Sequence, residues 1–128
     1  MSRLLLMVGI GGFAGSVLRY LISGYIQQLT QSSSFSYGTL VVNIVGCLII
    51  GILSQVAESY GLLTAETRAL LITGFLGGFT TFSTFSNETL NLFRDSENLA
   101  ALLNVGAHIF LGLGAVWMGR TFALIVWR

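Results

Sequence analysis

The sequence predicts an all-α integral membrane protein with four transmembrane helices, of which the third is broken near its middle. Of the 128 residues, 54% are hydrophobic and only 9% are charged, whereas a soluble domain has about 25% charged residues. Long apolar runs alternate with short polar stretches along the chain. The third run contains paired glycines followed closely by two threonines, a combination that disfavours a continuous helix.

The composition also excludes several classes of function. A net charge of +1 offers no basic surface for nucleic acid. Cys47 is the single cysteine and His108 the single histidine, so an internal disulfide, a thiolate cluster and a histidine-based metal site or catalytic triad have no support. We therefore expect no enzyme.

The first apolar run, residues 4–26, has 23 residues, enough for about 34 Å of helix against a hydrocarbon core of about 30 Å. Arg19 lies toward the end of this span, where an unpaired charge is costly. It either reaches the membrane interface, the interpretation we favour, or bonds to a partner inside the protein.

The second span covers residues 38–57 and carries Asn43. An amide in a membrane helix usually bonds to a neighbouring helix. The alternative is an anion donor, because Asn offers two N–H groups without a formal charge and can replace part of an ion's hydration shell.

The third span runs from residue 69 to 93 with a break near 77–81, so we expect two half-helices that meet near the middle of the bilayer. The paired glycines should unwind the chain and expose carbonyls, which protein, water or a cation must satisfy. Beyond the break, Phe82 and Phe85 project from one face of the resumed helix. Hydroxyl groups surround the two rings, on Ser83, Thr84 and Ser86. The combination of aromatic ring edges, hydroxyl groups and a broken backbone predicts a pathway for a small charged species.

The fourth span covers residues 99–127. Asn104 and His108 lie four residues apart and share a face, which indicates either a polar helix contact or a pore lining. Residues 1–128 thus form a single four-span membrane domain.

The arginines give only a slight orientation bias. If the N-terminus is cytoplasmic, the positive-inside rule places Arg3, Arg68, Arg120 and Arg128 inside against Arg94 outside. Chains with so weak a bias could insert both ways, and an antiparallel pair would supply the inverted symmetry common in transport proteins. Because four helices alone enclose little space, we expect at least a homodimer with the break near its symmetry axis.

The chain resembles the Fluc fluoride-channel family, also called CrcB, over essentially its full length. The resemblance rests on Gly11-Gly12 with Gly15 and Arg19-Tyr20, on Gly38-Thr39-Leu40-Val41-Val42-Asn43, and on Gly77-Gly78-Phe79-Thr80-Thr81-Phe82-Ser83-Thr84-Phe85-Ser86 with Glu88. It implies an antiparallel, dual-topology homodimer in the inner (plasma) membrane, with two pores that let F⁻ leave the cell passively and relieve fluoride toxicity.

The resemblance also implies roles for particular residues. Backbone carbonyls of Gly77 and Thr80 from both chains would hold a structural Na⁺ on the two-fold axis. We place Arg19 and Glu88 in the vestibule. The fluoride pore would be lined by Asn43, Phe82, Ser83, Thr84, Phe85 and His108. Gly112, one turn past His108, departs from the family pattern, which often has serine there.

Three rival interpretations remain. A drug/proton antiporter of the small multidrug resistance type shares the size and layout, but it needs an intramembrane carboxylate, and the first span has none. In a non-conducting structural subunit, the same glycines and phenylalanines would only pack helices. An intramembrane enzyme would need a nucleophile, base or metal set, and none is visible.

Overall fold

The computed structural model describes residues 1–32 and 34–127, and all regular structure in this part of the chain is helical. The elements are α1 (Ser2–Thr30), α2 (Tyr37–Tyr60), α3 (Ala65–Arg68), η1 (Ala69–Leu76), α4 (Gly77–Phe79), α5 (Phe82–Arg94) and α6 (Asn98–Val126). They make four helical segments long and apolar enough to cross a membrane, with α3 to α5 together forming the third. The prediction of a multi-pass all-α membrane protein is confirmed. The first three observed spans are longer than predicted, and the fourth is shifted by one residue at both ends.

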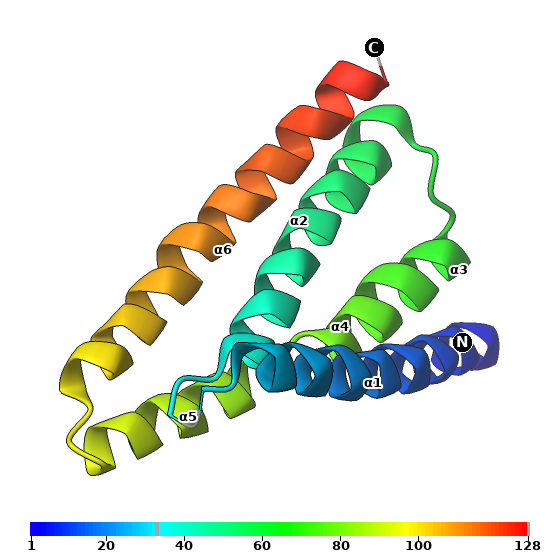
Figure 1. The fold of residues 1–128 in the computed structure, drawn as a ribbon. Helices are drawn as coiled ribbons and strands as arrows, with labels where there is room; N and C mark the ends of the chain where they lie inside the picture. Colours follow the sequence, from blue (N-terminus) through cyan, green and yellow to red (C-terminus); the bar gives the residue numbers. More distant parts are fainter. Residues whose placement is uncertain (33, 128) are drawn as a thin grey trace.

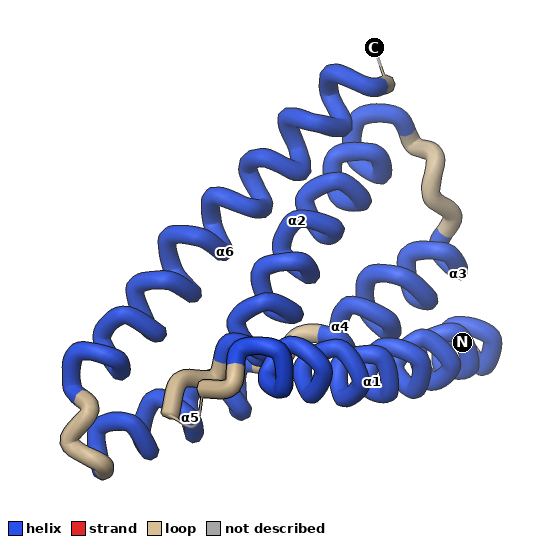
Figure 2. The backbone as a smooth tube through the Cα atoms, in the orientation of Figure 1, coloured by secondary structure: helices blue, strands red, loops and turns tan. Residues whose placement is uncertain are grey.

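The helices pack as two pairs (Figure 1). α2 lies along α6, and α1 lies along the first half of the third span. The two helices of each pair run in the same direction. This is possible because the chain crosses back between them, through α2 in one pair and through the third span in the other. Successive spans are joined by short loops, which are the tan segments in Figure 2. α5 leaves the second pair at the break and continues toward the start of α6.

Close helix approach depends on glycine at the contact points. A Cβ atom on Gly15 of α1 would lie 2.1 Å from the carbonyl oxygen of Phe75, and one on Gly119 of α6 would lie 2.3 Å from the carbonyl oxygen of Leu48. Both distances are far below van der Waals contact, so any side chain at these positions would push the paired helices apart. Lipid supplies little force for helix association, which makes such backbone packing important.

We expect Gly15→Ala to destabilise the protein by roughly 1–3 kcal/mol, the usual cost of overpacking. The added methyl group meets backbone atoms, which cannot rotate away. Thermal unfolding of the purified protein measures the effect. Gly9→Ala is the matched control, because a Cβ on Gly9 of the same helix meets nothing within 4 Å. Equal stability of the two variants would contradict the packing assignment.

The third span is broken as predicted, but not at its paired glycines. Gly77 and Gly78 are helical, and the extended residues are Thr80 (φ −94°, ψ 158°) and Thr81 (φ −152°, ψ 115°). The prediction that the glycines themselves unwind the chain is therefore wrong. Gly78 instead permits close packing on α1, since a Cβ there would lie 2.6 Å from the carbonyl oxygen of Gly12.

The threonines stabilise the two helix ends at the break. Thr80 Oγ1 donates to the carbonyl of Leu76 (2.9 Å), and Thr81 Oγ1 accepts the N–H of Thr84 (3.2 Å) as the N-cap of α5. The segment before the break, η1, is a π-helix, a wider turn that the sequence did not indicate and that often occurs near functional sites.

Candidate functional site

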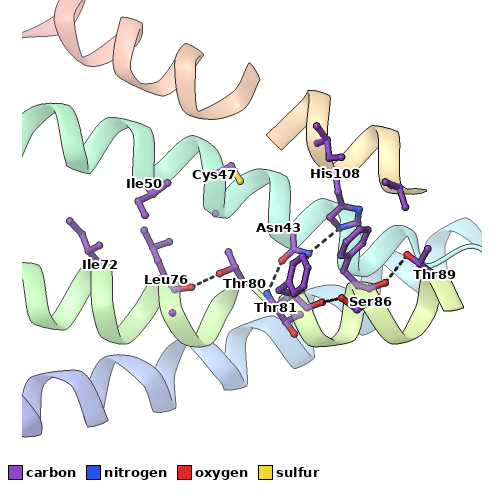
Figure 3. A pocket seen from close by; sticks show the side chains of 16 residues that line it. Asn43, Cys47, Ile50, Ile72, Leu76, Thr80, Thr81, Ser86, Thr89 and His108 are labelled. Atoms are coloured by element: carbon purple, nitrogen blue, oxygen red, sulfur yellow. Dashed lines mark hydrogen bonds between the residues drawn. The ribbon is translucent and has the colours of Figure 1, made fainter. Parts of the chain in front are cut away.

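A cavity of about 760 Å³ lies beside the break, between α2, the third span and α6. Figure 3 shows its lining side chains. Six of the residues assigned from the sequence to the pore or the cation site line it, namely Asn43, Gly77, Thr80, Phe82, Phe85 and His108, and so does Ser86. The remaining lining residues are mostly apolar, and none of the lining residues carries a carboxylate, guanidinium or ammonium group. The cavity therefore combines an uncharged apolar wall with a few polar groups.

Asn43 is the centre of the polar groups. Its Oδ1 accepts the backbone N–H of Thr81 (2.8 Å), and its Nδ2 donates to the backbone carbonyl of the same residue (3.2 Å). The second hydrogen of Nδ2 points to Nε2 of His108, at 3.0 Å (Figure 3). The side chain is almost fully buried. All three bonds that Asn43 makes are therefore internal to the protein.

The partners of His108 define its tautomer. Nδ1 lies 3.0 Å from the backbone carbonyl of Asn104, which can only accept, so Nδ1 carries the proton. Nε2 is then the acceptor for Asn43, as its donor requires. The imidazole is neutral in this arrangement. His108 and Asn43 thus form one hydrogen-bonded chain across α6, α2 and the break.

Two phenyl rings lie next to this chain. The centroid of Phe85 is 4.1 Å from that of His108 and 5.5 Å from that of Phe82, with tilted planes in both pairs. Phe82 is 79% exposed in the single protomer, although it lies in a helix of the membrane-spanning segment. Rings held at an angle present their electropositive edges to neighbouring groups.

Other predicted site residues lie outside this cavity. Ser83 is exposed, and Thr84 accepts from the hydroxyl of Thr81 at 3.0 Å. Glu88 accepts the Thr39 hydroxyl at 2.7 Å, while its Oε2 is buried without a partner among the described residues. Their roles in a pore or vestibule stay predictions.

The Arg19 side chain is hydrogen-bonded to a backbone carbonyl within the protein. Its Nε donates to the carbonyl of Gly78 at 2.9 Å, and the side chain is half-buried between α1 and α4. Of the two positions expected for this arginine, the structure shows the one we did not favour. The guanidinium thus binds one of the two carbonyls that lie between those of Gly77 and Thr80 in the sequence.

The break releases the two carbonyls that the resemblance assigned to a cation. A continuous helix would bond the N–H of Thr81 to the Gly77 carbonyl and the N–H of Thr84 to the Thr80 carbonyl. The first N–H binds Asn43 and the second binds the Thr81 hydroxyl. No cluster of His, Cys, Asp or Glu within residues 1–32 and 34–127 could hold a metal, so a cation here would be held by carbonyl oxygens, the ligands that hard cations prefer.

Sequence reasoning missed the contact between Asn104 and Thr89. Asn104, only 1% exposed, donates from Nδ2 to the Thr89 hydroxyl at 2.9 Å. Thr89 also lines the cavity. The spacing of Asn104 and His108 was the available signal. Asn104 makes a helix contact, one of the two interpretations, while His108 lines the cavity and its role in a pore stays a prediction.

Comparison with known proteins identifies the family. The profile of "CrcB-like protein, Camphor Resistance (CrcB)" matches residues 6–120. The chain belongs to the CrcB family. It is 46% identical over 118 residues to the "Fluoride-specific ion channel FluC" of Chlorobaculum tepidum, covering 92% of each chain. It is 44% identical over 120 residues to "Fluoride-specific ion channel FluC 1" of Methanosarcina acetivorans, covering 94% of this chain and 90% of the relative.

A third relative in the CrcB family matches from end to end. The "Fluoride-specific ion channel FluC" of Clostridium novyi is 42% identical over 129 aligned residues, which cover 99% of this chain and all of the relative. The resemblance that the motifs indicated is confirmed. The matched range includes Asn43, the break and His108, so the whole candidate site lies in the part of the chain that is shared with the CrcB family.

Proposed function

We propose that this protein is a fluoride-selective ion channel that lets F⁻ leave the cell passively across the inner (plasma) membrane and thereby relieves fluoride toxicity. The observation that carries the proposal is the cavity at the break, where phenyl rings adjoin the amide of Asn43 and the imidazole of His108. Relatives of similar length are named as fluoride-specific ion channels. Membership of a channel family agrees with the expectation that the chain is not an enzyme.

The chemistry of the cavity suits fluoride. Fluoride is small and holds its water strongly, so a pore must offer compact donors that replace water yet allow the ion to leave. Ring edges and an uncharged amide meet both needs, whereas a full positive charge would trap the ion. The lining contains no acidic residue, which also disfavours a drug/proton antiporter, because such a protein exchanges protons on a carboxylate in its substrate site.

The proposal includes an antiparallel, dual-topology homodimer with two pores. In a single protomer Phe82 is largely exposed, and a Cβ atom added to Gly77 would meet nothing within 4 Å. A second copy inserted in the opposite orientation would cover this face and complete the wall of the cavity. Fluoride, the second copy and membrane lipid are then the partners of the chain.

A structural Na⁺ on the dimer axis fits the freed carbonyls. Those of Gly77 and Thr80 lack their helical partners, and the corresponding pair of a second chain would double the number of oxygens around the ion. The cation would supply positive charge at the broken helix ends and join the two subunits. The neighbouring Gly78 carbonyl is taken by Arg19, which leaves the other two for the ion.

We expect Gly77→Val to weaken both the dimer and its response to sodium. The protomer itself has room for the new side chain, so loss of dimer should occur without loss of helical content. Size-exclusion chromatography and circular dichroism measure the two properties. Gly24→Val, at another open position, is the control. A Gly77→Val protein that keeps its dimer and its sodium response would contradict this cation site.

Fluoride efflux from liposomes that contain the purified protein tests the proposed function. A fluoride electrode should record fast efflux, while a chloride gradient of the same size should give negligible leak. Well-folded, dimeric protein that conducts neither ion would contradict the proposal and favour a non-conducting structural subunit.

A further inference from the structure

Asn43 holds the broken helix in the way that a neighbouring β-strand holds its partner. Its Oδ1 accepts the N–H of Thr81 at 2.8 Å, and its Nδ2 donates to the Thr81 carbonyl at 3.2 Å. This is the exchange of two bonds with one residue that occurs in an antiparallel sheet. Thr81 is accordingly extended, with φ −152° and ψ 115°. A side chain of α2 thus fixes the backbone conformation at the break.

The pairing of Asn43 with Thr81 leaves the Gly77 carbonyl without its helical hydrogen bond. If the helix continued, the N–H of Thr81 would bond to the carbonyl of Gly77, four residues earlier. Because Asn43 takes that N–H, the Gly77 oxygen keeps its lone pairs for another partner. All bonds of the Asn43 side chain go to Thr81 and His108, and by binding Thr81 it keeps one of the proposed ligands, the Gly77 carbonyl, available.

The third bond of Asn43 leads toward the anion path. Both hydrogens of its Nδ2 are engaged, one by the Thr81 carbonyl and one by Nε2 of His108 at 3.0 Å. An anion can bind this amide only by replacing one of these acceptors. Replacing the Thr81 carbonyl would undo the pairing at the break, whereas replacing His108 leaves it intact. The hydrogen that faces His108 is therefore the one available to the ion.

We propose that Asn43 is a positioning residue that couples the cation site to the anion path. Its pairing with Thr81 keeps the Gly77 carbonyl free for Na⁺, and its remaining N–H alternates between His108 and the passing anion. The inference rests on the proposed function and assigns to this amide a structural duty in addition to lining the pore. Loss of the Asn43 amide should consequently weaken sodium binding even when no fluoride is present.

The test is the sodium-dependent thermal stabilisation of the purified protein, titrated with sodium chloride against N-methylglucamine chloride without fluoride. A ligand that binds only the folded state raises stability with the logarithm of its concentration, which yields an apparent affinity. In Asn43→Leu, which has nearly the same shape but no polar group, the Thr81 N–H can return to Gly77. We expect the apparent sodium affinity to fall by about tenfold or more, the equivalent of one hydrogen bond.

His108→Leu is the matched control, because it leaves both bonds between Asn43 and Thr81 intact and removes only the third bond of Asn43, together with the contacts of His108 to Asn104 and Phe85; it should keep the sodium affinity of the wild type. If Asn43→Leu does not fold, Asn43→Ser, whose hydroxyl is too short to pair with Thr81, replaces it. A wild-type sodium affinity in the Asn43 variant overturns the inference, and so does an equal loss in His108→Leu. Absence of any sodium response in the wild type overturns the inference together with the cation site, while fluoride efflux still reports separately on conduction.

Discussion

Replacing Asn43 by aspartate should reduce fluoride efflux by at least about a hundredfold. A carboxylate at this position puts a negative charge beside the proposed anion path and removes both amide donors. Two like charges 4 Å apart repel by about 4 kcal/mol at an effective dielectric constant of 20, which corresponds to roughly a thousandfold in occupancy. Efflux from liposomes, normalised to the amount of folded protein, measures the effect.

The Asn43→Asp protein should still fold, because an aspartate oxygen can accept the Thr81 N–H as Oδ1 of Asn43 does. Asn91→Asp is the control, since it makes the same chemical change at an exposed position of α5 outside the cavity. Normal conduction by Asn43→Asp would show that this amide does not lie in the ion's path.

Replacing Phe82 or Phe85 by isoleucine should reduce fluoride efflux by roughly tenfold for each ring. Isoleucine keeps the apolar character of the site but lacks the quadrupole whose positive edge attracts an anion. The same quadrupole contributes about 0.5–1.5 kcal/mol to a pair of aromatic rings, and we expect an effect of similar size for each ring here. The two rings lie 5.5 Å apart in the cavity, and Phe85 also packs on His108. An ion could therefore pass from one ring edge to the next.

The phenylalanine variants should keep the proposed dimer, which chromatography of the variants and the wild type can verify before efflux is measured. Phe122→Ile provides the comparison, because Phe122 is exposed on α6 and does not line the cavity. If both Phe82→Ile and Phe85→Ile conduct like the wild type, the assignment of the ring edges to the anion is wrong.

Much of the fold could be predicted from the sequence. A long apolar run in a membrane has few alternatives to helix, because every backbone group must be satisfied within the segment. Length and composition therefore determined the number of spans, and their boundaries fell within a few residues of the observed ends. The combination of glycine and threonine in the third run likewise indicated that this helix is interrupted.

The predicted range 77–81 contains the observed break, but the sequence could not tell which of these residues leave the helix. Glycine lowers helix stability by itself, but a close contact with another helix can retain it, and Gly78 packs on α1 in this way. The chain opens after these glycines, at Thr80 and Thr81, because Asn43 from a different helix binds both backbone groups of Thr81. No local pattern contains that information.

For the candidate site too, one part could be predicted from the sequence and another part could not. The residue types were readable from the sequence, since Asn43, Asn104 and His108 are polar groups in otherwise apolar spans, and the two phenylalanines follow the glycine and threonine segment directly. The tertiary structure decided which of them meet: it joined Asn43 to His108 and to the break, placed Arg19 on the Gly78 carbonyl, and left Ser83 and Thr84 outside the cavity. The composition of a segment determines whether it can lie in a membrane as a helix. The partners of a buried polar group depend instead on which other helices pack beside it, and only the tertiary structure gives that.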